Sequence, residues 1–99
     1  MAKRLWSVFT KDMEHCIETG TPHCHRHHIF GASNRLKSEW YGFVIPIAWN
    51  LHEFGEESIH ENPNKGLDLK WKQKAQEYYE SNYGTREQFI KEFGRNYLD

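Results

Sequence analysis

The amino-acid sequence predicts an α+β domain, with strands in the first half of the chain and helices in the second. Residues 5–10 and 43–49 are short runs rich in aromatic and β-branched side chains, a composition typical of strands. Residues 67–82 instead repeat apolar side chains at spacings of four, four and three, which is one face of a helix. Strands first and helices last indicate α+β architecture. The chain has 99 residues, so one domain over 1–99 is expected.

The N-terminal part is predicted to be a β-hairpin. Residues 5–10 form its first strand, and a turn over 16–22 follows because a glycine and a proline interrupt regular structure there. Residues 24–30 then resume as extended chain. This pairing would bring Cys16 and Cys24 face to face, where they could share a structural metal, form a disulfide, or remain two buried free thiols.

The middle of the chain is predicted to hold a short helix and then a buried strand. Ser33 or Asn34 can cap a helix that ends near Trp40, with Gly42 as its left-handed terminator. The strand at 43–49 is the most apolar run of the sequence. It contains a proline, which indicates an edge strand or a bulge. The residues that follow it form either one helical turn or an irregular loop.

Two helices are predicted at the C-terminal end. Leu67, Trp71, Ala75 and Tyr78 define the apolar face of the first, which extends over 67–82. The second begins with the sequence Thr-Arg-Glu-Gln, which is a capping-box pattern. Gly94 is expected to end it.

Composition and charge limit the classes of function. The net charge is −1, whereas DNA-binding proteins usually carry a clear basic excess. No segment is long and apolar enough to cross a membrane, and the first residues are not followed by the apolar core of a signal peptide. Two cysteines without the spacing of a disulfide framework indicate a reducing compartment. A cytoplasmic protein with no membrane contact is therefore expected.

Histidines are concentrated in one short stretch. Four of the seven lie within residues 23–28. Histidine is the commonest metal ligand and accepts a proton near neutral pH, so this density predicts a metal site or a catalytic site. Successive side chains of a strand point to opposite faces, so His27 and His28 can serve one site only if the strand ends or bends beside them.

The histidine stretch belongs to a longer pattern that resembles a known family. The chain is similar to a phage-borne branch of the His-Asn-His nucleases, the phage recombination-enhancement (Ref-like) nuclease domain. The residues that carry this likeness lie at 27–35, 38–42, 52, 58–60, 67–70, 75–76, 86–90 and 93–98.

The resemblance implies a small ββα-metal (His-Me finger) core and a metal-dependent nuclease. His28 would be the general base, and His27 and His52 would hold one divalent cation. His60 would be a third ligand or a phosphate contact. An asparagine normally orients the base in this family, and Asn34 and Asn50 are the two candidates.

The chain also departs from the pattern that the family shows. Typical members hold a structural zinc ion between two cysteine-containing pairs. Cys16 occupies one of these ligand positions here, but Thr19, Ala48 and Leu51 occupy the others. That zinc is expected to be absent or to be rebuilt from Cys16, Cys24 and nearby histidines. Aromatic packing would then supply the lost stability.

The residue types themselves limit which metal ions the site would prefer and which side chains could contact DNA. Imidazole ligands favour Mn²⁺, Ni²⁺ or Zn²⁺ over Mg²⁺, which prefers oxygen. Arg35, Lys70 and Lys74 are candidate contacts to DNA phosphates, although lysines on a helix are usually solvated.

Three classes of function follow from these observations. The first is a DNA endonuclease or nickase of phage origin, in the host cytoplasm, working with a phage or host recombination or processing protein. The second is a degenerate nuclease scaffold that binds protein or DNA. The third is a small metal-stabilised structural domain.

Overall fold

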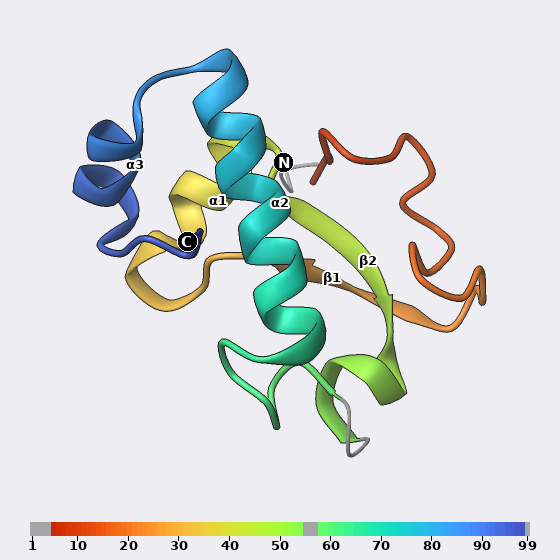
Figure 1. Ribbon diagram of the computed structural model, residues 1–99. Coiled ribbons are helices and arrows are strands. Elements are labelled where there is room, and N and C mark those ends of the chain that lie inside the picture. The colour runs from red at the N-terminus through yellow and green to blue at the C-terminus, as the bar shows by residue number, and fades with distance from the viewer. Residues whose placement is uncertain (1–4, 55–57, 99) are drawn as a thin grey trace.

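The computed structural model describes residues 5–54 and 58–98 and has an α+β architecture, as the sequence predicts. The described residues form a two-stranded antiparallel sheet and three α-helices, arranged as Figure 1 shows. The sheet comprises β1 (Cys24–His28) and β2 (Val44–Ala48), with His28 opposite Val44. The α-helices and short helical turns are η1 (Ala32–Asn34), α1 (Arg35–Tyr41), η2 (Asn50–Phe54), α2 (Gly66–Asn82) and α3 (Arg86–Phe93).

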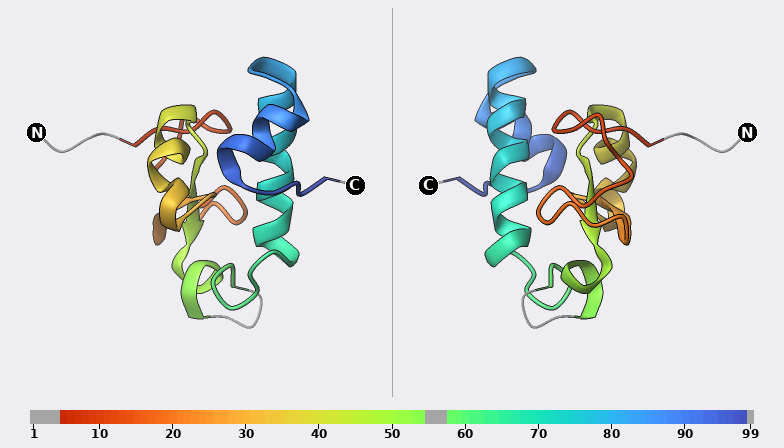
Figure 2. Two further views of the ribbon diagram at one scale, coloured as in Figure 1. Left: turned by 90° about the vertical axis from the view of Figure 1, so that its left-hand side faces the viewer. Right: turned by 90° about the vertical axis from the view of Figure 1, so that its right-hand side faces the viewer.

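The strand β2 runs through the middle of the molecule. The views in Figure 2 place α1 on one side of it and α2 with α3 on the other. All five residues of β2 are buried, as expected for a strand covered on both faces. Its proline, Pro46, pairs with Arg26 of β1, and a two-stranded sheet leaves β2 an outer edge. The predicted edge position of this proline is therefore confirmed.

Aromatic side chains form most of the core. The Phe30 and Phe93 rings lie 4.5 Å apart, and those of Phe89 and Phe93 lie 4.8 Å apart. Isoleucines of β2 and of the segments beside it complete the same cluster. Large aromatic rings let a short, polar sequence bury enough apolar surface to fold.

The local signals for the helix ends are confirmed. Gly42 ends α1 and Gly94 ends α3, with φ angles of 73° and 90° in the left-handed region that glycine tolerates. Thr85 accepts a hydrogen bond from the Gln88 backbone and forms the predicted capping box. Asn34 precedes α1 as predicted, but its side chain does not cap the helix.

The predicted N-terminal hairpin is wrong. Residues 5–10 form no strand, and β1 pairs with β2 instead. One backbone hydrogen bond of 2.9 Å, from Val8 to Gly42, links this segment to the chain before β2. The Phe9 ring packs against Phe43, Trp71 and Tyr78. The Phe9 side chain thus serves core packing rather than a strand. None of the described helices is long and apolar enough to cross a membrane.

Candidate metal centre

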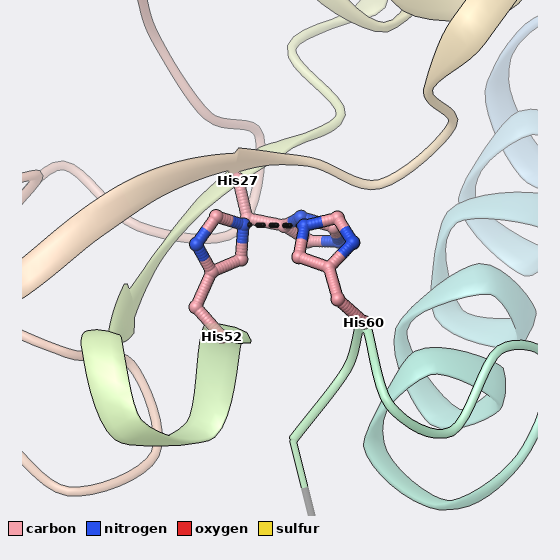
Figure 3. A group of neighbouring side chains, drawn as sticks. All are labelled: His27, His52 and His60. Carbon is pink, nitrogen blue, oxygen red and sulfur yellow. Dashed lines mark hydrogen bonds between the residues drawn. The ribbon is translucent and has the colours of Figure 1, made fainter. Parts of the chain in front are cut away.

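Three histidines from separate segments converge at one end of the sheet. Figure 3 shows the side chains of His27 from β1, His52 from η2 and His60 from the loop before α2 pointing toward one another. One ring nitrogen from each lies within 4.8 Å of the other two. The Nε2 atoms of His52 and His60 are 3.0 Å apart. Among the described residues, these three histidines are the group of histidine, cysteine or acidic side chains close enough together to hold a metal ion.

Backbone hydrogen bonds hold two of these histidines together. The His60 amide donates to the His52 carbonyl at 3.1 Å, and the Ile59 amide donates to the Leu51 carbonyl at 2.6 Å. Ile59 is buried in the core, so it anchors the segment that carries His60. The convergence therefore rests on main-chain contacts as well as on the orientation of the rings.

His27 is the most enclosed of the three. Its side chain is 7% exposed. Burial, and then the nearby charges of His52 and His60, lower the pKa of His27 to about 3. The ring is therefore neutral at physiological pH, which leaves one nitrogen with the lone pair that a metal ligand requires.

The three side chains fit a transition-metal ion. Two nitrogen ligands of a tetrahedral ion, each bonded at about 2.0–2.1 Å, lie roughly 3.3 Å apart. The 3.0 Å separation between His52 and His60 is close to this value. Three imidazoles leave a fourth position open for water or substrate, as in catalytic zinc sites. An all-nitrogen set favours Zn²⁺, Ni²⁺ or Mn²⁺ over Mg²⁺.

His28 has a different partner from His27. Its Nε2 lies 2.8 Å from Oε2 of Glu39 on α1, and the two side chains are 9% and 17% exposed. β1 ends at His28, and His27 and His28 line one cavity of about 590 Å³. The end of the strand thus gives these neighbouring histidines access to the same space.

Cationic side chains line the same cavity. Arg26, Arg35 and Lys72 contribute to its wall, with Asp68 as the acidic residue. Lys72 pairs with Asp68 at 2.9 Å, whereas Arg26 reaches Glu14. The exposed Arg35 has no ion pair within the described part of the chain. The cavity wall therefore carries more positive than negative charge, which suits an anionic ligand.

No family model, curated protein or solved structure matches this chain. The function of the site is therefore inferred from its own geometry.

In the described part of the chain, no hydrogen bond joins His28 to either candidate asparagine. The Asn34 side chain lines the cavity but donates to the Phe93 carbonyl at 3.0 Å, which ties η1 to the end of α3. Asn50 is exposed on η2. Within the described residues, the hydrogen-bond partner of the His28 ring is Glu39. The sequence offered no spacing rule that would have revealed this pairing.

The candidate DNA-binding lysines lie away from the cavity. Lys70 pairs with Glu18 at 2.7 Å, and Lys74 lies 5.7 Å from the Trp71 ring centroid. Lys72 faces the cavity instead. Positions 70 and 74 lie on the opposite side of a helix from position 72. The (i, i+4) pair of Asp68 and Lys72 is the sequence signal that marks the cavity face of α2.

Cys16 and Cys24 are free thiols and join no group of three metal ligands in the described residues. Burial raises the pKa of Cys16, but hydrogen bonds from Thr19 and from the backbone of Ala48 and Glu18 outweigh it, and the net shift is downward. Burial and the charge of Cys16 raise the pKa of Cys24. The structure therefore contains no disulfide between Cys16, which is buried, and Cys24, which is half-buried.

Proposed function

We propose that the protein is a metal-dependent DNA endonuclease or nickase that hydrolyses a phosphodiester bond. His27, His52 and His60 would hold one divalent cation, and His28 would be the general base. The observation that carries this proposal is the presence of a three-histidine group and a histidine–carboxylate pair in the wall of one cavity. In phosphodiester hydrolysis, the three-histidine group would hold the metal ion, and the histidine–carboxylate pair would supply the general base.

The pairing with Glu39 defines the role of each nitrogen of His28. A carboxylate accepts hydrogen bonds, so Nε2 of His28 carries the hydrogen that it donates to Glu39. The Nδ1 atom of the neutral ring then keeps its lone pair. This nitrogen is available to remove a proton from an attacking water molecule, while Glu39 stabilises the positive charge that the ring acquires.

The remaining cavity residues would bind the phosphate. When bound, a divalent cation polarises the scissile phosphate and stabilises charge on the leaving oxygen. Arg35 is an exposed cation in the same wall and would contact a phosphate oxygen. Lys72 adds positive charge at a fixed place, because Asp68 and the Asn64 side chain hold its ammonium group.

The order of the elements also supports the proposal. Along the chain, the strand that ends in His27 and His28 is followed by η1 and α1, then by the antiparallel strand β2, and then by the helical turn that carries His52. This order agrees with the ββα-metal core that the resemblance to the His-Asn-His nucleases implies. The three altered zinc-ligand positions and the pairing of His28 with Glu39 distinguish this chain from that pattern.

The net charge suggests that other proteins assist DNA binding. At −1, long-range attraction to DNA is weak, so affinity would come from the few contacts around the cavity. We propose a phage or host recombination or processing protein as the partner that brings the nuclease to DNA.

The second candidate is a protein-binding module on the same scaffold, without catalysis. Trp40 and Leu36 project from the outer face of α1 and are 59% and 50% exposed, and Trp6 beside them is 45% exposed. Exposed aromatic side chains of this kind are enriched at protein interfaces. This exposed surface supports binding to a partner protein. A nuclease could carry the same surface, so the surface does not argue against catalysis.

Nicking of supercoiled plasmid by the purified chain tests the proposal. Reactions contain EDTA, Mg²⁺, Mn²⁺, Ni²⁺ or Zn²⁺, with His28→Ala and the exposed-site control His23→Ala in parallel. We expect metal-dependent nicking that His23→Ala retains and His28→Ala loses. Absence of nicking with every metal, in a folded chain that binds metal, would reject the nuclease and favour the binding module.

A further inference from the structure

A fourth histidine contacts the metal group from outside. His25 lies on β1 two residues before His27, so both side chains are on the same face of the strand. Its Nδ1 atom is 3.1 Å from Nδ1 of His52, and the two ring planes are at 82°.

The two nitrogens of His52 therefore have separate partners. Nε2 faces His60, and Nδ1 faces His25. The two nitrogens of an imidazole ring point in different directions, so one ion can bind only one of them. An ion held by His27, His52 and His60 would lie on the Nε2 side of His52, because that nitrogen faces His60. His25 is thus outside the coordination shell.

The contact determines where the hydrogen of His52 must be. A neutral imidazole has one N–H, and the nitrogen that binds a metal must have none. With Nε2 of His52 facing the ion, its hydrogen is on Nδ1 and is donated to His25. Nδ1 of His25 then accepts, and the hydrogen of His25 is on its own Nε2. The opposite arrangement would place a hydrogen between His52 and the ion.

We propose that His25 is a positioning residue of the metal centre, which fixes the ring orientation and the tautomer of His52. Histidine ligands usually donate their second N–H to a carboxylate, a carbonyl or water, and loss of such a partner weakens metal binding by roughly 10–100-fold. Here another histidine is the acceptor. The inference rests on the metal site of the proposed function and is independent of whether the site cleaves DNA.

Metal affinity of the full chain tests this role. Zn²⁺ and Co²⁺ binding are measured by competition with a chelator of known affinity, for the unaltered chain, His25→Ala, His25→Asn, His25→Gln and His23→Ala. We expect His25→Ala to weaken binding by roughly 10–100-fold. The Asn side chain places its amide oxygen near the former Nδ1 position and should restore affinity. Gln, whose amide lies farther out, should restore less, and His23→Ala should bind as the unaltered chain does.

Spectroscopy separates positioning from direct coordination. The Co²⁺ absorption bands of His25→Ala should keep the positions and intensity of the unaltered chain once the site is saturated. In the zinc-loaded chain, long-range ¹H–¹⁵N correlations should show the hydrogen of His52 on Nδ1. Altered cobalt bands would make His25 a ligand and overturn the inference, as would equal affinity of His25→Ala and the unaltered chain.

The outcomes also separate this inference from the nuclease proposal. Weaker metal binding by His25→Ala, in a chain that never nicks plasmid, supports the positioning role and rejects the nuclease. If His25→Ala binds metal as tightly as the unaltered chain, and the unaltered chain nicks plasmid, the nuclease is supported and the positioning role is rejected. Failure of the unaltered chain to bind either metal overturns both.

Discussion

Nε2 of His28 lies 2.8 Å from Oε2 of Glu39, which joins the end of β1 to α1. Both side chains are largely buried, so the interaction is stronger than an exposed ion pair would be. In the proposed mechanism, Glu39 orients the base and stabilises its protonated form.

Removal of the carboxylate should reduce cleavage without changing metal binding. We expect Glu39→Ala to lower the nicking rate by about 10²-fold, because the base loses its orientation and its counter-charge. Glu39→Gln should retain part of the rate, since its amide oxygen can still accept from His28. Rates are measured at saturating Mn²⁺, with chelator competition for metal affinity and the exposed Glu87→Ala as control. Equal rates for Glu39→Ala and the unaltered chain would exclude Glu39 from the mechanism.

Metal should stabilise the folded chain through His27. A ligand that binds only the native state adds about 2.7 kcal/mol at a concentration 100 times its Kd. We therefore expect Zn²⁺ to raise the Tm of the unaltered chain and EDTA to reverse the change. His27→Ala should abolish the rise in Tm, whereas the exposed-site control His23→Ala should retain it. Differential scanning calorimetry gives the Tm, and an equal rise in His27→Ala would show that zinc binds elsewhere.

The chain should lose stability at alkaline pH through the tyrosines around Glu92. Burial, and then the hydrogen bond to Glu92, raise the pKa of Tyr79 to about 12, and the same causes raise the pKa of Tyr41. Above pH 10, the unfolded chain ionises these tyrosines while the folded chain does not. The free energy of unfolding should therefore fall between pH 10 and 12, by at most about 1.4 kcal/mol per pH unit for each tyrosine.

Urea unfolding across this pH range measures the effect. Tyr79→Phe removes one ionisable group and should make the pH dependence less steep, even if its stability at pH 8 is lower. An unchanged slope in this variant would show that Tyr79 is not responsible.

Phosphate binding should depend on Arg35 and not on Lys74. Both side chains are exposed cations, but only Arg35 lines the cavity. We expect Arg35→Ala to weaken DNA binding and to reduce the dependence of log K on log salt by about one. Fluorescence anisotropy with labelled DNA in EDTA, over a series of salt concentrations, gives both quantities. A similar loss for Lys74→Ala would place the DNA on the other face of α2.

The elements predicted correctly are those whose signals are local. Gly42 and Gly94 end helices because only the backbone of the same turn is involved, and Thr85 starts α3 by bonding three residues ahead. The strand predicted at 5–10 failed because composition alone does not supply a pairing partner. The Phe9 side chain of this segment instead packs against Phe43 and Trp71.

The sequence by itself determined the α+β order, the helix ends and the concentration of imidazoles on β1. The alternation of side chains along a strand also predicts that His27 and His28 point to opposite faces. Only the tertiary structure decided which residues meet them. His52 and His60 reach His27 across 25 and 33 positions of sequence, and Glu39 reaches His28 across 11. Such contacts depend on how β2, η2 and α1 pack, which no local pattern of residues specifies.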